Sequence, residues 1–240
     1  MLSKYIIPGE RIEMYAVDRK LESNPVSNKK AYVSKVFDIL SEDRLEITMP
    51  LEKTKLILLP VGEEYDMYFY TKKGLYQCFA KVTDRYKSNN VYILVLELVS
   101  NLRKFQRREY YRFGCAIDTR VRALEKEEID ALEKNEEYII PDIPMQEGII
   151  VDISGGGIRF ITDNLYEAGT MVYCKYQLQM TQGLKEYKMT GRILNNREVD
   201  NRPGEYEHRL QYVNFKEAER EEIIRYIFEE ERKHRQKEKG

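Results

Sequence analysis

The sequence predicts a mainly β protein with two β-rich domains in tandem and a C-terminal α-helix. Short runs rich in Tyr, Val, Ile, Phe and Thr alternate with polar turns, as is typical of a sandwich or small barrel. A basic break at residues 102–112 separates two groups of such runs, and residues 216–239 carry apolar positions at helical spacing. With 240 residues, the chain is long enough for two domains that each bury a core.

The first hundred residues contain five predicted strands. The polar turn Ser41-Glu42-Asp43-Arg44 joins the first two in hairpin style, and Thr71-Lys72-Lys73-Gly74 joins the next two. A polar loop at residues 84–90 precedes the fifth. The predicted strands are residues 30–40, 45–50, 64–70, 75–83 and 91–99.

Between Leu102 and Arg112 the composition becomes strongly basic. Neither strand nor helix periodicity fits this segment, so we interpret it as a linker and the entrance to the second domain. Its basic residues, against the single acid Glu109, are Arg103, Lys104, Arg107, Arg108 and Arg112. The expected organisation is a β domain at 1–100, a basic linker at 101–112, and a second domain with the terminal helix at 113–240.

The second domain begins with one long alternating strand. Its predicted core face contains Tyr111, Phe113, Cys115, Ile117, Thr119, Val121 and Ala123, and its outer face contains Arg112, Asp118, Arg120 and Arg122. The acidic segment Glu125–Glu137 is expected to be a solvated, partly helical excursion. Further strands are predicted at residues 148–153, 158–162, 170–180, 185–194 and 205–215, with a turn at Ser154-Gly155-Gly156-Gly157. The last segment predicts an amphipathic helix that docks through Ile223, Ile224, Ile227 and Phe228.

Composition and charge exclude several classes of protein. The 40 Lys and Arg nearly balance the 41 Asp and Glu, which argues against a dedicated nucleic-acid coat. Three widely spaced cysteines predict neither a disulfide framework nor a metal site, and instead predict buried thiols in a reducing compartment. No run is long enough to span a membrane, so a soluble cytoplasmic protein is expected. His208 and His234 lie in no nucleophile or metal motif, and no catalytic signature is present, so we do not expect an enzyme.

Two motifs in the second domain contain residue types that suit the binding of a nucleotide. Arg108-Glu109-Tyr110-Tyr111-Arg112 and Asp152-Ile153-Ser154-Gly155-Gly156-Gly157 combine guanidinium forks, which match phosphate oxygens and the guanine edge, with a carboxylate that accepts from guanine N–H groups. One site of this kind would hold a guanine nucleotide by both ends. A purely structural role stays open, in which Asp152 and Ser154 stabilise a hairpin and the arginines pair with nearby acids. The alternative register Arg103 to Arg107 also stays open at this point.

These motifs resemble the PilZ family, whose receptors for the bacterial second messenger cyclic di-GMP have an Arg-x-x-x-Arg loop ahead of a six-stranded barrel and an Asp/Asn-x-Ser-x-x-Gly motif on it. The extra arginine in "QRR" favours Arg108 and Arg112 as the matching pair. The overall layout resembles the YcgR-type flagellar brake proteins. The resemblance therefore implies two β-barrels in tandem, the N-terminal one split-barrel-like and the C-terminal one a PilZ barrel, followed by the helix.

The resemblance also implies a ligand, its contacts and a role. The implied ligand is cyclic di-GMP, with an intercalated dimer favoured and no metal. Its implied contacts are Arg107, Arg108, Arg112, Asp152, Ser154, Gly157 and Arg159. Binding at the domain junction would order the arginine loop and change how the domains are arranged. The partner would then be a flagellar motor protein, stator or switch, and the protein would be recruited from the cytoplasm to the basal body to slow motility.

Two other functions compete with this one. The basic linker with its interleaved Phe105, Tyr110 and Tyr111 is compatible with nucleic-acid binding, although the near-neutral total charge and the acidic segment disfavour it. A ligand-independent scaffold with a PilZ fold is the other rival, and the intact motifs disfavour it. Neither nucleic acid nor a membrane span is expected.

Overall fold

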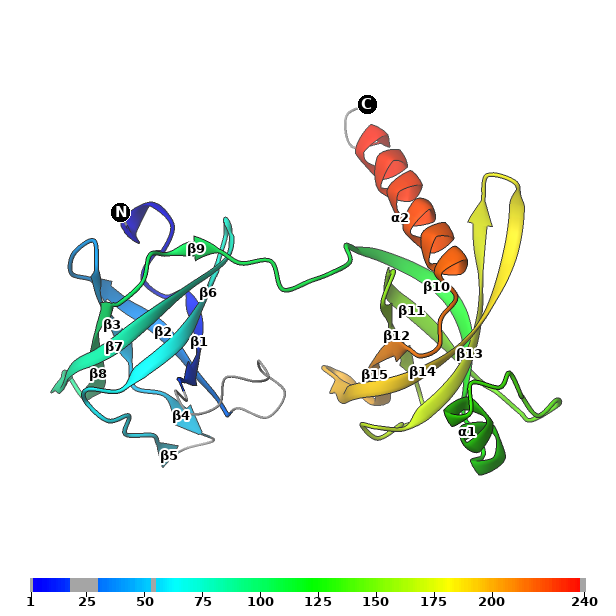
Figure 1. Cartoon of the computed structure of the whole chain (residues 1–240), viewed down its shortest axis with the longest axis horizontal. Helices are drawn as coiled ribbons and strands as arrows, with labels where there is room; N and C mark the ends of the chain where they lie inside the picture. Colours follow the sequence, from blue (N-terminus) through cyan, green and yellow to red (C-terminus); the bar gives the residue numbers. More distant parts are fainter. Residues whose placement is uncertain (1, 18–29, 53–54, 238–240) are drawn as a thin grey trace. The chain divides into compact units, whose positions relative to one another are not determined.

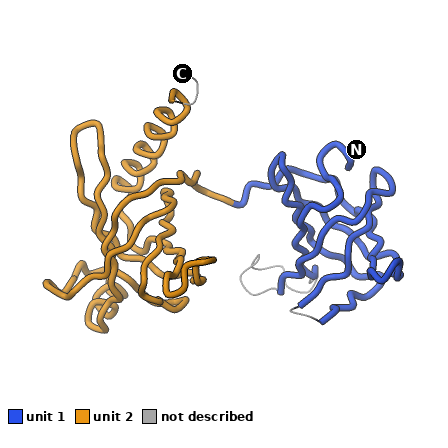
Figure 2. Tube along the Cα trace, turned by 180° about the vertical axis from the view of Figure 1, so that it is seen from behind, with its two compact units in different colours: residues 1–107 blue, residues 108–240 orange. Residues whose placement is uncertain are grey.

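The computed structural model describes residues 2–17, 30–52 and 55–237. The chain divides into two compact units, residues 1–107 and 108–240 (Figure 2). Each unit has its own buried core of apolar side chains, and the two are described separately below.

Unit 1 is a ring of antiparallel strands (Figure 1). The order of its sheet is β6-β1-β2-β3-β8-β7-β9, and additional pairing between β6 and β7 closes the ring. Its elements are a 3-10 helix η1 (Leu2–Lys4) and the strands β1 (Arg11–Ala16), β2 (Ala31–Ile39), β3 (Arg44–Thr48), β4 (Leu51–Glu52), β5 (Lys55–Leu56), β6 (Glu64–Thr71), β7 (Gly74–Ser88), β8 (Val91–Leu98) and β9 (Arg103–Lys104).

All five strands predicted for this half are present. The structure also contains β1 and the two-residue strands β4, β5 and β9, which were not predicted, and β9 lies in the segment interpreted as a linker. No strand was predicted at β1, a six-residue strand whose only fully buried side chains are Ile12 and Met14. Residues 84–88 continue β7, although they were predicted to be a loop. A register shift between Val82 and Asp84 precedes an exposed strand end with polar residues, and the turn is confined to Asn89 and Asn90, both at positive φ.

Unit 2 is a closed six-stranded barrel with two helices. The strand order is β10-β11-β12-β15-β14-β13, and every pair is antiparallel. The elements are β10 (Arg112–Ala123), α1 (Lys126–Glu133), β11 (Gln146–Ser154), β12 (Gly157–Thr162), β13 (Met171–Met180), β14 (Gly183–Val199), β15 (Arg202–Tyr212) and α2 (Glu217–Lys237). The predicted fold class, mainly β with a C-terminal six-stranded barrel and a terminal helix, is confirmed.

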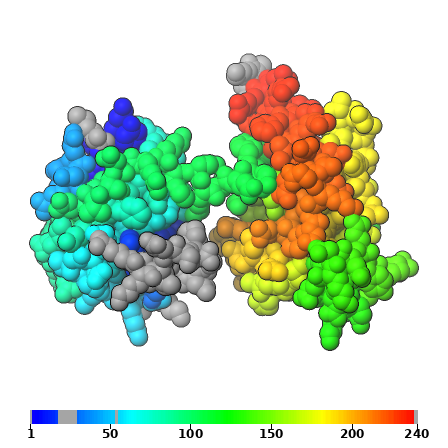
Figure 3. Space-filling view, viewed as in Figure 1, coloured from blue at the N-terminus to red at the C-terminus, as the bar shows by residue number. Residues whose placement is uncertain are grey.

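Helix α2 packs onto the barrel core through its middle. Ile223, Tyr226 and Ile227 are buried in the same cluster as the barrel interior, and burying side chains of this size stabilises the fold by roughly 1.5–3 kcal/mol each. Phe228, predicted to dock, is 56% exposed and was assigned to the wrong face. The helix lies beside the β13–β14 hairpin (Figures 1 and 3), where Glu222 forms an ion pair with Lys185.

The acidic segment is not simply a solvated excursion, because a buried ion pair fixes its helix α1. Arg122 donates two hydrogen bonds to Glu128, at 2.7 and 2.6 Å, and the two side chains are 6% and 0% exposed. The prediction that Arg122 faces solvent is therefore wrong. Tyr111, predicted to face the core, precedes the strand and is 52% exposed. A register shift between Gly114 and Ile117 further disturbs the alternation that the sequence analysis assumed.

The cysteines are free thiols, as their spacing predicted. Cys78 and Cys174 are buried and Cys115 is partly buried. Burial raises the pKa of Cys78 and Cys174 to about 12. Among the described residues, no helix combines the length and apolarity needed to cross a membrane.

Candidate functional site

Strand pairing in unit 2 aligns the second motif with the end of the first. In an antiparallel barrel, residues directly opposite each other on neighbouring strands form rows, and positions two apart on one strand share a face. One row runs across five strands through Arg112, Ser154, Gly157, Gln211 and Arg192. The adjacent row runs through Gly114, Asp152, Arg159, Arg209 and Asn195. Five of the seven predicted contacts, Arg112, Asp152, Ser154, Gly157 and Arg159, therefore lie in two neighbouring rows.

The Ser154–Gly157 turn connects β11 to β12 and is held by the serine itself. The Ser154 hydroxyl donates to the Gly157 carbonyl oxygen at 3.0 Å and accepts from the Gly156 N–H at 3.4 Å. A Cβ atom on Gly157 would lie 2.0 Å from the carbonyl oxygen of Leu210 on β15, so only glycine allows these strands to approach this closely. The hairpin-stabilising role that the sequence left open for Ser154 is thus present.

A chain of alternating charges crosses the outer face of the barrel. Arg159 donates from Nε to Asp152 at 2.6 Å and from Nη1 to Glu207 at 2.8 Å. Arg197 binds the same Glu207 carboxylate at 3.0 Å. Burial would raise the pKa of Glu207, but the hydrogen bond from Arg197 and the charge of Arg159 hold it below its ordinary value. Arg159 is therefore already compensated by two carboxylates.

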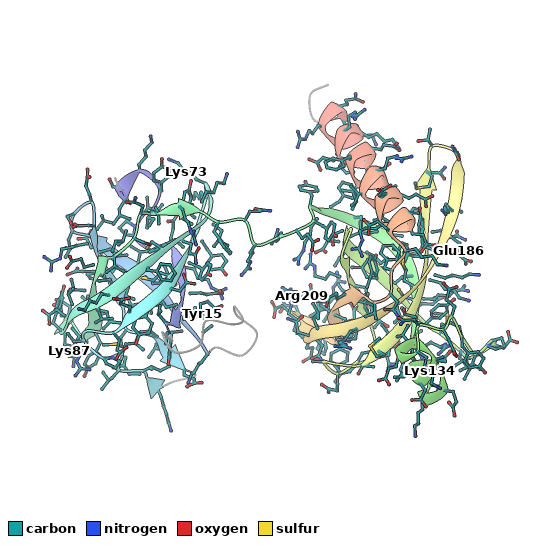
Figure 4. The ribbon with its side chains drawn as sticks, viewed as in Figure 1. Tyr15, Lys73, Lys87, Lys134, Glu186 and Arg209 are labelled. Carbon is teal, nitrogen blue, oxygen red and sulfur yellow. The ribbon has the colours of Figure 1, made fainter. Side chains whose placement is uncertain are left out.

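Arg209, next to Arg159 in the row, has no such compensation. Its side chain is exposed on β15 (Figure 4), and it forms no hydrogen bond or ion pair with the part of the chain that the structure describes. An exposed guanidinium beside Arg159, in the same row as Asp152, can bind an anion without first breaking an ion pair. Arg209 was not among the predicted contacts, because only the pairing of β12 with β15 places it beside Arg159 of the motif hairpin.

The remaining two predicted contacts lie before the barrel. Arg107 is the last residue of unit 1, where its Nη1 donates to the Tyr70 hydroxyl at 2.7 Å and lies 3.9 Å from Glu13. Its guanidinium is 5.2 Å from the centroid of the Tyr70 ring, within cation–π range. Arg108 is the first residue of unit 2 and is exposed.

The competing arginine register is engaged within unit 1. Arg103 on β9 donates two hydrogen bonds to Gln77 Oε1, at 3.1 and 2.8 Å. Phe105 packs edge-on against Tyr68, with ring centroids 5.1 Å apart. Much of the basic linker thus belongs to the surface of unit 1.

The site is an open barrel face whose chemistry suits binding. Burial, reinforced by the Asp152 charge, raises the pKa of the Cys115 thiol to about 12, so this cysteine is a poor nucleophile. In the described ranges, no group of three or more His, Cys, Asp and Glu is placed to hold a metal ion. A groove of about 1020 Å³ on the same barrel is lined by other residues, such as Ile149, Lys175 and Leu184. Guanidinium groups, a carboxylate and backbone amides remain as the groups that a ligand would meet.

Comparisons with known proteins bear on this geometry. Residues 8–98 match a family model described as flagellar protein YcgR, and residues 106–229 match the PilZ domain. The structure of the inhibitor of motility MotI/DgrA from Bacillus subtilis superposes with a TM-score of 0.72 at 16% identity, covering 94% of this chain and 98% of that one. YcgR from Escherichia coli in complex with cyclic di-GMP gives a TM-score of 0.48 at 14% identity, covering 96% and 88%. No curated protein sequence matches significantly.

The PilZ match covers the barrel, both motifs and most of α2, which is more than half of the chain. The YcgR match covers most of unit 1. Together with the closed barrel and the aligned motif rows, these matches show that the chain belongs to the PilZ-domain family, with the two-domain organisation of the YcgR type.

Proposed function

We propose that this protein is a non-catalytic receptor for cyclic di-GMP. The observation that carries the proposal is the alignment of Arg112 with Ser154 and Gly157, next to the row of Asp152, Arg159 and Arg209. In this proposal, Arg108 and Arg112 bind phosphates and stack on guanine, and Asp152 accepts from a guanine edge. Gly157 keeps the turn close to β15, and Ser154 positions the turn and contacts the ligand.

Two ligand molecules bind per site, as an intercalated dimer. The second molecule brings two further phosphate charges, so it needs cationic groups beyond the arginine loop. Arg209 supplies one without breaking an ion pair, whereas Arg159 must share its guanidinium with Asp152 and Glu207. A calorimetric stoichiometry near two ligands per chain is the expected result.

Titration calorimetry with cyclic di-GMP tests the proposal. The full-length protein should bind, and Arg108→Ala and Arg112→Ala should each abolish measurable binding. Arg120→Ala is the matched control. Arg120 lies on β10 as Arg112 does, is exposed, and forms only a long ion pair with Glu147, at 3.9 Å. No heat with the wild-type protein at tens of micromolar, a range already weak on the affinity scale, would refute the receptor function. Equal losses in all three variants would mean that the attraction is diffuse.

Ligand binding changes the arrangement of the two units. Arg107 contacts Tyr70 and Glu13 in unit 1 and immediately precedes Arg108. If the ligand recruits Arg107, it exchanges these contacts for a phosphate, and the segment joining the units takes a new path. Small-angle scattering should then differ with and without ligand. An unchanged scattering curve at saturating ligand would exclude this step while leaving binding intact.

The downstream partner is a flagellar motor protein, and the receptor acts from the cytoplasm at the basal body. This is supported by the match of unit 1 to the flagellar protein YcgR model and by the fold shared with an inhibitor of motility. A pulldown with motor stator and switch proteins, with and without cyclic di-GMP, tests it. Ligand-dependent capture of neither would exclude the motor as the target.

A further inference from the structure

Tyr110, midway between Arg108 and Arg112, lies directly on the glycine turn of the second motif. A Cβ atom built on Gly155 would be 2.6 Å from Tyr110 Cδ1, and one on Gly156 would be 3.1 Å from Cδ2. Real Cβ atoms do not approach a ring carbon as closely as the first of these distances. Glycine at position 155 is therefore what allows the tyrosine ring to contact the turn.

Helix α2 holds the ring and the turn together through one side chain. Arg220, in the first turn of α2, donates from Nη1 to the Gly155 carbonyl oxygen at 2.8 Å and to the Tyr110 hydroxyl at 3.2 Å. Its guanidinium is 5.3 Å from the centroid of the Tyr110 ring. The Arg220 side chain is only 20% exposed, and its Nε forms an ion pair with Glu217 at 3.0 Å.

We propose that Arg220 is a positioning residue for the ligand site, a proposal that rests on the receptor function. Arg112 is placed by the pairing of β10 with β11, but Arg108 precedes the first residue of that strand by four positions. The contact of Tyr110 with Gly155 therefore limits where Arg108 can lie in relation to Asp152 and Ser154. Arg220 maintains that contact from a third element without touching the ligand.

The physical gain is preorganisation. A loop that is already fixed loses less conformational entropy when a ligand binds, so affinity rises without any new ligand contact. A tenfold loss of affinity corresponds to the conformational entropy of fixing about one backbone residue, and we expect a loss of this size when Tyr110 is released. The sequence alone does not indicate this role, because Arg220 lies 65 positions after Gly155.

A double-mutant cycle separates positioning from general stability. Arg220→Gln and Tyr110→Leu should each weaken cyclic di-GMP binding about tenfold, and the double variant should lose no more than either single one, because both remove the same constraint. Arg220→Lys should recover part of the loss, since lysine still donates to Gly155. Arg225→Gln is the matched control: Arg225 is exposed on the same helix, and affinity should stay within about twofold of wild type.

A spectroscopic reporter follows the contact itself. The chain contains no tryptophan, so Tyr110→Trp introduces a single tryptophan at the turn, and its emission is the signal that is followed. Adding Arg220→Gln to this variant should increase quenching by acrylamide, and adding Arg225→Gln should not. If Arg220→Gln reduces the helix content measured by circular dichroism, the affinity of the Tyr110→Leu variant decides whether the positioning role holds, because this variant leaves the hydrogen bond from Arg220 to Gly155 in place.

The outcomes distinguish this inference from the proposed function. A wild-type protein that does not bind cyclic di-GMP would refute the receptor function. A wild type that binds, with an Arg220→Gln variant of equal affinity or with additive losses in the double variant, would overturn the positioning role alone. Unchanged quenching in the Arg220→Gln background would also overturn it.

Discussion

Replacing Glu128 by glutamine tests whether one buried ion pair anchors the acidic helix α1. Each of the two carboxylate oxygens of Glu128 accepts two hydrogen bonds. One accepts from Arg122 at 2.6 Å and from the Ile140 N–H at 2.7 Å, and the other from Arg122 at 2.7 Å and from the Glu125 N–H at 2.8 Å. Glutamine keeps one such oxygen, but its amide NH₂ group would face two donors at the other position.

The expected cost is large because Arg122 stays buried. Breaking a buried pair by neutralising one partner typically costs about 3–5 kcal/mol of unfolding free energy, since the other charge is left uncompensated. Replacing both partners, as in Arg122→Met with Glu128→Leu, should cost clearly less, because no buried charge remains. Glu127→Gln on the exposed side of the same helix should change stability by less than about 0.5 kcal/mol.

The assay is urea unfolding of the full chain followed by far-ultraviolet circular dichroism, fitted to two transitions because the chain has two units.

The pH dependence of the unfolding free energy gives an independent check. The hydrogen bond from Arg122 lowers the pKa of Glu128 from an ordinary 4.5 to about 2, although burial opposes this. Because the folded pKa is depressed, the stabilisation is complete above about pH 4.5 and is lost as the pH falls towards 2. The wild-type advantage should shrink by about 2 kcal/mol between pH 7 and pH 3. A cost below about 1 kcal/mol at pH 7, or an advantage that does not change with pH, would refute the anchoring role.

Three other predictions follow from the barrel of unit 2. Arg209→Ala should weaken cyclic di-GMP binding about tenfold with an unchanged urea midpoint, which calorimetry would show; full affinity would remove Arg209 from the site. Gly157→Ala should lower the unfolding free energy by about 3 kcal/mol or more, because its Cβ would meet the Leu210 carbonyl oxygen, and a near-wild-type melting temperature would contradict this. His208 is fully buried and accepts from the Tyr166 N–H, and burial lowers its pKa. Protonation therefore disfavours the folded state, and stability should fall below about pH 6.5 in wild type but not in His208→Gln; parallel pH profiles would show that His208 does not titrate.

The parts of the site that the sequence predicted are those that depend on local geometry. Asp152, Ser154 and Gly157 lie within one hairpin, so their spacing determines their arrangement once the turn is recognised. Arg209 joins them only because β12 pairs with β15, a neighbour that follows from the strand order of the closed barrel. Local alternation cannot reveal that order.

The same limit explains the errors about burial. Arg122 alternates with apolar residues and therefore looked exposed, but a carboxylate on the following helix compensates its charge. Phe228 shares the helical spacing of Ile223 and Ile227, yet the barrel surface covers only part of that face. In both cases the decisive neighbour is an element whose position the periodicity does not specify.

The closure of both strand rings limits how a partner protein can be recognised. In unit 2 every barrel strand has a neighbour on each side over part of its length, but some stretches pair on one side only, such as residues 183–190 of β14, which pair with β13 before the pairing with β15 begins at Gly191. In unit 1 the pairing of β6 with β7 closes the described ring, with the two-residue strand β9 at its border. Long unpaired strand borders are the usual templates for β-augmentation and for uncontrolled aggregation. Where strands pair on both sides, a peptide therefore finds no main-chain hydrogen-bonding groups to dock against, and such groups remain only along the one-sided stretches of the described rings. Away from those stretches, recognition must rely on side chains and surface shape, so it should respond to single substitutions on the surface and resist competition by generic β-strand peptides.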